Sequence, residues 1–273
     1  MVSIKDVNLA DALTDKTALT KSETKEPKPC ERCGQLQEPI VFPELGISID
    51  RPPICPKCVE RAEQEKVEAA RRWRIENIEV LMADAGVPKE FLKHEFLKSK
   101  DGPIKWGKAM DPILETCVAY SLKPEGALVL SGKTGRGKTH LAVSILREHL
   151  LRGRKGKFEV CMELMNAVRS VYRARQSDDD STEQEVVNRV GKGLVILDDL
   201  GATRVTPLMK DIMTLIVDRC ERNGQPIVVT TNLSMAELGE QIDERLASRL
   251  VGMCEPKNRV IRLEGPDFRL KRK

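Results

Sequence analysis

Aromatic residues are scarce in this chain, and long apolar stretches are missing. Phe, Tyr and Trp together make up 3% of the 273 residues, too few to cover a nucleic-acid-binding surface with stacking platforms. No run approaches the roughly 18 apolar residues of a membrane-spanning helix. The first residues also lack the basic segment and apolar core of a secretory signal. We therefore expect a cytoplasmic protein with no membrane partner.

Charge, in contrast, is abundant and nearly balanced. The 46 Lys and Arg residues exceed the 42 Asp and Glu residues to give a net charge of +4, a mild bias that suits phosphate-bearing partners without requiring them. The eight cysteines of a cytoplasmic chain favour a metal site or buried thiols over disulfides. The length allows one sizeable α/β domain and a small accessory module.

One glycine-rich segment matches the phosphate-binding pattern G-x-x-x-x-G-K-[ST] at every fixed position. It follows a short apolar run, 126 to 131, and precedes a run with helical apolar spacing, 139 to 151, which is the context the pattern needs. Glycines let the backbone wrap the phosphates, and the helix N-terminus adds partial positive charge. We predict ATP as the ligand, with Lys138 on the β- and γ-phosphates and Thr139 on magnesium. The predicted nucleotide-binding residues of this phosphate loop are Gly132, Lys133, Thr134, Gly135, Arg136, Gly137, Lys138 and Thr139.

Apolar strand candidates alternate with helical segments from Gly126 onward, which predicts a parallel sheet covered by helices on both faces. The five expected strands are 126 to 131, 157 to 162, 193 to 198, 226 to 231 and 258 to 263. The fold class expected is therefore α/β, a P-loop nucleoside triphosphatase with a five-stranded parallel sheet.

Two of these strands end in residues suited to a magnesium nucleotide site. The third ends in Asp198 and Asp199; Asp198 would contact magnesium, and Asp199 would accept a proton from the attacking water or orient it. Either carboxylate could instead cap the following turn. Asn232 follows the fourth strand and is a candidate sensor of the γ-phosphate. The alternative role for Asn232 is helix capping, but Ser234 and Glu237 already form a capping-box pattern.

Four of the cysteines form two CxxC pairs separated by 21 residues, close to the spacing of zinc ribbons. Each pair makes a tight turn that offers two sulfurs to one metal, and zinc can supply the folding energy that such a short segment lacks. A thioredoxin-like redox pair would need one CxxC near a βαβ unit. The predicted zinc ligands are Cys30, Cys33, Cys55 and Cys58.

Composition divides the chain into four parts. We predict a flexible tail at 1 to 29, a zinc-binding module at 30 to 60, a helical linker at 61 to 100 and the ATPase domain at 101 to 273. A continuous connecting helix is expected from Val59 to about Met82, and another from Met110 to Leu122.

From about Asn77 onward the chain resembles the AAA+ ATPases of the DnaC/DnaI helicase-loader and IstB families. The matching pieces are GKTGRGKTHLA, LVILDDLGA, IVVTTNLS, ERLASRL and LEGPDFRLKRK. The resemblance implies an AAA+ core, here without the helical lid because the chain ends soon after its last expected strand. It also implies a weak ATPase, stimulated by DNA or partner, that delivers the replicative ring helicase onto single-stranded DNA during replication initiation or restart.

The resemblance further implies that ATP sites lie between the protomers of a homo-oligomer. Arg245 and Arg249 share a helical face by spacing and could be only a solvated pair. The resemblance makes Arg249 the expected arginine finger, with Arg245 as the fallback. It also implies that the zinc module grips the helicase. Two other functions stay open: an IstB-like transposition helper, and an adapter that binds ATP without turning it over.

Overall fold

The computed structural model describes residues 25–42, 45, 47–96, 110–175, 189–202, 206–265, 267, 268 and 270, with the side chains of 171–175 excepted. Most of the predicted flexible tail lies outside these residues. The chain divides into two compact units, Met1–Ala69 and Ala70–Lys273, and each is described by itself.

The N-terminal unit is built from two short antiparallel pairs followed by a helix. β1 (Lys28–Pro29) pairs with β2 (Leu36–Gln37), and β3 (Ile40–Phe42) pairs with β4 (Ile47–Ile49). Helix α1 (Pro56–Glu76) begins here, and its last residues belong to the C-terminal unit. The buried cluster of this unit consists of Cys30, Cys55 and Cys58. Cysteine side chains therefore form the buried centre of this unit, where a larger domain would have an apolar core.

The C-terminal unit contains the predicted five-stranded parallel sheet. Its strands, given in spatial order, are β6 (Gly156–Val160), β7 (Leu194–Leu200), β8 (Ile227–Thr231), β5 (Ala127–Ser131) and β9 (Val260–Arg262). Each lies within about two residues of its predicted range. β8 separates β5, which precedes the phosphate loop, from β7, which carries the two aspartates. The residues after β8 therefore lie between the two halves of the predicted site.

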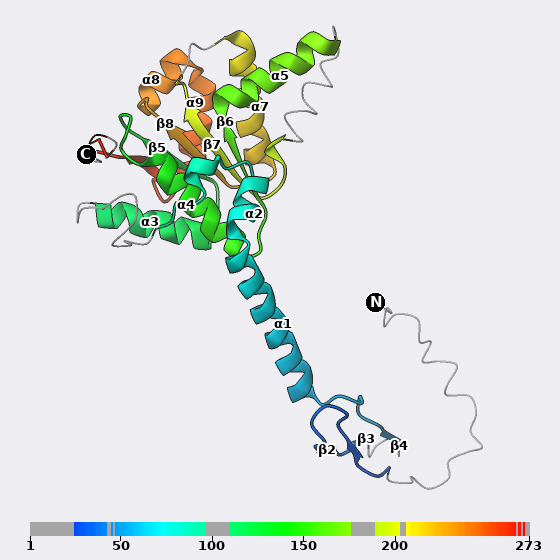
Figure 1. Ribbon diagram of the computed structural model, residues 1–273. Coiled ribbons are helices and arrows are strands. Elements are labelled where there is room, and N and C mark those ends of the chain that lie inside the picture. Colours follow the sequence, from blue (N-terminus) through cyan, green and yellow to red (C-terminus); the bar gives the residue numbers. More distant parts are fainter. Residues whose placement is uncertain are drawn as a thin grey trace. The chain divides into compact units, whose positions relative to one another are not determined.

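Side chains of the central strands alternate between two buried cores, as the two-residue period of a strand requires. Val129, Leu197 and Val229 point to one core, whereas Leu130, Ile196 and Val228 point to the other. The first core is covered by α5 (Cys161–Arg175), α7 (Pro207–Arg222), α8 (Met235–Gln241) and α9 (Glu244–Cys254). The second is covered by α2 (Ile78–Asp84), α3 (Asp111–Leu122) and α4 (Lys138–Leu151). Figure 1 shows these helices as two layers on either side of the sheet.

The predicted continuous helix from 59 to 82 is wrong in one detail, because it is interrupted at Asn77. The Asn77 side chain donates to the carbonyl oxygen of Trp73 at 2.8 Å and ends α1, and α2 starts at Ile78. Ile78 and Met82 are buried in the core beneath α4. This part of the predicted linker thus packs as part of the C-terminal unit. A short 3-10 helix, η3 (Lys89–Phe91), follows it.

The described residues that follow β9 contain no helix. Among the helices in the described ranges, none has both the length and the apolar composition needed to cross a bilayer.

Candidate functional site

The phosphate loop connects β5 to α4 through three glycines in the left-handed region. Gly132, Gly135 and Gly137 have φ values of 136°, 76° and 88°, which side chains with a Cβ rarely adopt. None of the backbone N–H groups of residues 133 to 137 donates to another described group. The Arg136 Nη1 atom is buried and likewise has no described partner. The loop therefore presents free donors at a helix N-terminus, which suits it to bind a polyphosphate.

Lys138, the first residue of α4, lies in the middle of this loop and is 5% exposed. Its ammonium group donates to the carbonyl oxygens of Gly132 and Lys133 at 2.7 and 3.0 Å. It also donates to Oδ1 of Asn232 at 2.8 Å. The predicted phosphate lysine and the predicted sensor asparagine are therefore in direct contact. The Ser234–Glu237 capping box is present as expected. The Asn232 side chain therefore does not cap this helix and instead accepts a hydrogen bond from Lys138.

Asp198 faces the phosphate loop from the end of β7. The Thr139 hydroxyl donates to its two carboxylate oxygens at 2.9 and 3.1 Å. The structure thus joins the two predicted magnesium ligands directly. Asp198 is 4% exposed, and burial together with the charge of Asp199 raises the pKa of its carboxyl to about 6, against the hydrogen bonds from Thr230 and Thr139. A buried carboxylate with a raised pKa beside a threonine hydroxyl fits a divalent cation.

Asp199 lies at a point where the strand pairing changes. The register between β7 and β8 shifts between Leu197 and Leu200, and Asp199 adopts φ 56°, an uncommon conformation for a residue other than glycine. Asp199 is exposed, whereas Asp198 is buried. Strain of this kind is typical of functional sites. Two consecutive carboxylates of one strand thus have different surroundings: Asp198 accepts from Thr139, and Asp199 is exposed to solvent.

Thr230, which the sequence analysis missed, holds this bulge in place. Its hydroxyl donates to Oδ1 of Asp198 at 2.6 Å and accepts the backbone N–H of Asp199 at 2.9 Å. Thr230 is fully buried in β8. The polar residues that end this otherwise apolar strand were the available signal, but only the sheet order shows that they meet the aspartates.

The segment after β9 also contacts the phosphate loop. The backbone N–H of Phe268 donates to the carbonyl oxygen of Gly135 at 2.9 Å. A Cβ on Gly135 would collide with the Asp267 carboxylate. Gly135 is therefore needed for this packing as well as for its backbone angle. Arg269, in the same segment, lies outside the described residues.

The two candidate finger residues lie on α9, in different surroundings. Arg249 pairs with Asp218 at 2.8 Å and with Glu221 at 2.9 Å, both on α7. Arg245 is exposed, and its guanidinium forms no ion pair within the described ranges.

The four predicted zinc ligands come together in the N-terminal unit. Their sulfur atoms all lie within 4.8 Å of one another, and the sulfurs of Cys33 and Cys55 are 3.8 Å apart. Tetrahedral zinc with bonds of about 2.3 Å places its sulfurs about 3.8 Å apart. The backbone N–H of Cys55 donates to the Cys30 sulfur at 3.2 Å and is the main cause that lowers the pKa of the Cys30 thiol to about 6. All four thiols are free, so the set fits a zinc ion.

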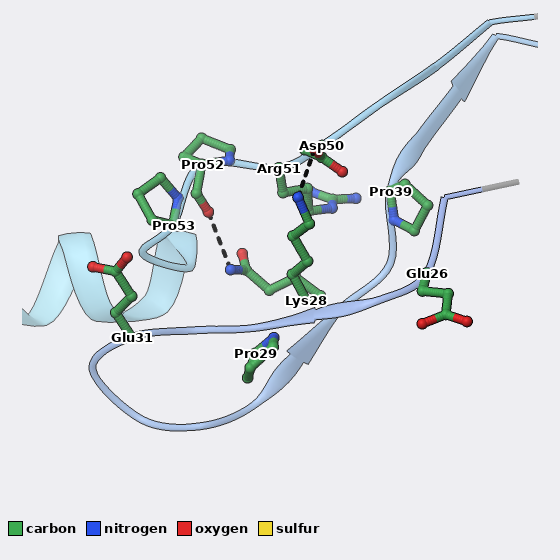
Figure 2. Close-up of a pocket in the computed structure, with 10 residues that line it drawn as sticks. Glu26, Lys28, Pro29, Glu31, Pro39, Asp50, Arg51, Pro52 and Pro53 are labelled. Atoms are coloured by element: carbon green, nitrogen blue, oxygen red, sulfur yellow. Dashed lines mark hydrogen bonds and ion pairs between the residues drawn. The ribbon is translucent and has the colours of Figure 1, made fainter. Parts of the chain in front are cut away.

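A few polar contacts also join the segments of this unit. A cavity of about 420 Å³ lies beside β1, and the Lys28 ammonium at its wall pairs with Asp50 at 2.8 Å (Figure 2). The Gln37 side chain donates to the Pro52 carbonyl oxygen at 3.1 Å. Salt bridges this exposed stabilise little. The cysteine cluster is therefore the main element that can hold the unit together.

A family model described as "IstB-like ATP binding protein" matches residues 65–273. The replicative helicase loader DnaC of Escherichia coli K12 is 30% identical over 125 residues, which cover 45% of this chain and 49% of DnaC. The insertion sequence IS5376 putative ATP-binding protein of Geobacillus stearothermophilus is 29% identical over 147 residues, which cover 54% and 56%. The chain spans about half the length of these curated relatives.

Solved structures of two proteins share the fold. The crystal structure of the DnaC helicase loader has a TM-score of 0.54 at 20% identity and covers 65% of this chain and 100% of its own. The crystal structure of DnaI has a TM-score of 0.51 at 20% identity, with coverages of 67% and 94%. At this identity the two structures support the P-loop fold and no finer property.

Proposed function

Because the chain belongs to the family of IstB-like ATP-binding proteins, we propose that it is an ATP hydrolase that loads a replicative ring helicase onto single-stranded DNA in bacterial or phage replication. The observation that carries the ATPase part is the paired contact of Lys138 with Asn232 and of Thr139 with Asp198. These two contacts join the phosphate loop to Asn232 and to the acidic end of β7 at the carboxyl ends of the strands, where open α/β sheets bind their ligands.

Each residue of this edge has a task in binding or hydrolysis. The free N–H groups of the loop and Lys138 would hold the phosphates, and Thr139 and Asp198 would hold magnesium. The bound ion neutralises charge on the transferring phosphoryl group. Asp199 is exposed at the strand end and would orient the attacking water or accept its proton. Asn232 would exchange its bond to Lys138 for one to the γ-phosphate.

The arginine finger would come from a second copy of the chain. Arg249 would leave Asp218 and Glu221 to reach a neighbour's nucleotide and neutralise charge on the phosphoryl group. Arg245 needs to break no ion pair and is the alternative. Hydrolysis would then be weak in the isolated protein and stimulated when DNA or the helicase brings protomers together.

The exposed apolar hairpin of the N-terminal unit, formed by β3 and β4, supports the proposal of a protein partner. Apolar side chains of β3 and β4 are 38% to 53% exposed, namely those of Ile40, Val41, Phe42, Ile47 and Ile49. Side chains of this kind gathered on one small hairpin indicate an interaction surface. The DnaC relatives are named as replicative helicase loaders, so a helicase is the partner that we propose for this surface.

Replacing Ile40 and Ile49, which are cross-strand partners on one face of the hairpin, by Ser in the full-length chain should weaken retention of the host's replicative helicase by roughly tenfold or more, since central apolar contacts carry much of an interface's energy. Retention can be measured by pull-down and by sedimentation of the mixture. The matched control is Val67→Ser, which removes a similarly exposed valine from α1, 66% exposed, and should leave retention unchanged. A chain that retains a transposase and prefers duplex DNA would instead identify an IstB-like transposition helper.

Replacing Asp199 by Asn should abolish most ATP hydrolysis and leave nucleotide binding intact, because Asp199 is exposed and does not contact Thr139. A loss of about 100-fold or more is expected for a group that acts on the attacking water. Phosphate release is measured with single-stranded DNA present, and binding by a fluorescent ATP analogue. Equal background rates in the native and variant proteins would favour an adapter that does not turn ATP over.

A further inference from the structure

A basic cavity lies near the amino-terminal ends of β6 and β7, whereas the nucleotide site lies at the carboxyl ends of the strands. It has a volume of about 490 Å³ and is bounded by the last turn of α1, the loop between α4 and β6, and the loop before β7. Five cations and one carboxylate line it, a balance of 5 − 1 = +4. The cations are Arg74, Arg154, Lys155, Lys157 and Lys192, and the carboxylate is that of Asp84.

None of these five cations forms an ion pair with a carboxylate in the described part of the chain. Where they donate hydrogen bonds, the acceptors are backbone carbonyls: Arg74 to Leu151, Arg154 to Leu122 and Lys157 to Asp84, each at 2.9 Å. Other cations of the same unit do find carboxylates, for example Arg152 with Glu148 and Arg189 with Glu159. The cavity therefore keeps a local positive potential that attracts anions.

Trp73 adds an aromatic face to this cavity. Its side chain is 55% exposed, the only aromatic side chain described in the C-terminal unit that lies largely in solvent. A side chain with more than half of its surface in solvent contributes little to the packing of the core, so packing does not account for this tryptophan. An exposed indole among cations is the combination that binds a base and its phosphate together.

Three glycines contribute backbone to the lining of the cavity. Gly153, Gly156 and Gly191 line it, and two of them, Gly153 and Gly191, have positive φ. A Cβ on Gly156 would collide with Leu146. Gly156 is therefore required by packing against the core, whereas Gly153 and Gly191 allow turns with positive φ at the wall of the cavity.

This cavity is distinct from the nucleotide site. It adjoins the last residues of α4 and the first residues of β6, whereas Lys138 begins α4 and Asp198 lies near the end of β7. A 14-residue helix is about 20 Å long. A ligand in the basic cavity therefore touches none of the groups that hold ATP.

We propose that this cavity binds single-stranded nucleic acid, with a base stacked on Trp73 and the flanking phosphates on the basic side chains. The proposal rests on the proposed loader function for its choice of single-stranded DNA. In a duplex the bases are stacked on one another and cannot reach an indole on the protein surface, so the site favours unpaired strands. An acidic protein segment would match the charge of the cavity and make no use of the indole face.

Trp73 can report the binding directly, because the chain has two tryptophans and Trp106→Phe leaves Trp73 alone. Titration of that variant with an oligothymidylate of about 10 nucleotides should quench the indole emission to saturation, and less so at higher salt. In full-length protein, Trp73→Ala should weaken binding of a labelled oligonucleotide by roughly 5- to 150-fold, with Trp73→Phe restoring most of it. Lys155→Glu with Lys192→Glu should lower the salt slope by about 1.4, at about 0.7 per lost phosphate contact.

The matched control for charge is Lys66→Glu with Lys210→Glu, which makes the same change in net charge at lysines that do not line the cavity. ATP binding should be unchanged in all of these variants, and helicase retention is scored separately. Absence of quenching, or equal losses in the two double-charge variants, would overturn the proposal. So would cavity variants that bind the oligonucleotide normally and lose the helicase, since the cavity would then be a protein-binding surface.

Discussion

Asp198→Asn should make the protein more stable without nucleotide and abolish its stabilisation by magnesium ATP. Burial raises the pKa of Asp198 from about 3.8 to about 6, so between these pH values the folded state binds more protons than the unfolded state. The free energy of unfolding therefore falls as pH rises through this window. Above pH 6 the carboxyl is ionised in the folded state, which then bears the full desolvation cost of the buried charge. Removing the charge should gain about 1–3 kcal/mol above pH 6.

Asparagine fits the site because its hydrogen bonds can be kept. Oδ1 of an amide can still accept from Thr230, and the Thr139 hydroxyl can accept from the amide nitrogen. The gain should be seen as a higher urea midpoint at pH 8 and should disappear near pH 4, where the native carboxyl is protonated as well. A variant that is destabilised at pH 8 would contradict the assignment of Asp198 as a buried carboxylate whose ionised form is costly to desolvate.

The same variant should lose the ligand effect of magnesium ATP. Native protein at a nucleotide concentration of about 100 times Kd should gain about 2.7 kcal/mol, and Asp198→Asn should gain little, because a neutral amide is a poor magnesium ligand. Asp199→Asn is the control, since Asp199 does not contact Thr139 and should keep most of the gain. Equal ligand stabilisation in native protein and Asp198→Asn would remove Asp198 from the magnesium site.

The strands and the phosphate loop could be predicted because their signals are local. A short apolar run between turn residues marks a buried strand, and the glycine pattern requires a strand before it and a helix after it. The order of the strands could not be predicted, because β5, β7 and β8 are all apolar and fully buried over most of their length. Nothing in such runs tells which two are neighbours.

The parts of the site that were missed depend on that order. Thr230 holds Asp198 and the backbone of Asp199 only because β8 lies beside β7. The contact of Phe268 with Gly135 likewise depends on β9 pairing with β5. The basic cavity combines residues from three separate segments, so no stripe of charge was visible along the chain. Long-range contacts of this kind leave no periodic signal in the sequence.

Removing the metal should unfold the N-terminal unit and leave the ATPase unit folded. The buried cluster of the N-terminal unit consists of three cysteines, so the unit has almost no apolar core of its own, and structural zinc supplies about 10–16 kcal/mol in peptides of this kind. A strong chelator should remove one zinc per chain, and the variant with Cys30→Ser and Cys58→Ser should carry none; mass spectrometry measures both. Either change should also make the segment around Arg32 and Arg51 sensitive to trypsin.

ATP binding should survive this treatment, because the two cores of the C-terminal unit contain no residue of the cysteine cluster. Helicase retention should be lost with the zinc, since the apolar hairpin belongs to the unit that unfolds. Cys117→Ser and Cys220→Ser are the matched controls, because both thiols are buried in the ATPase unit and should leave zinc content unchanged. Joint loss of zinc and ATP binding would show that the two units depend on each other for folding. A native protein that contains no zinc would contradict the zinc site and favour a redox role for the four thiols.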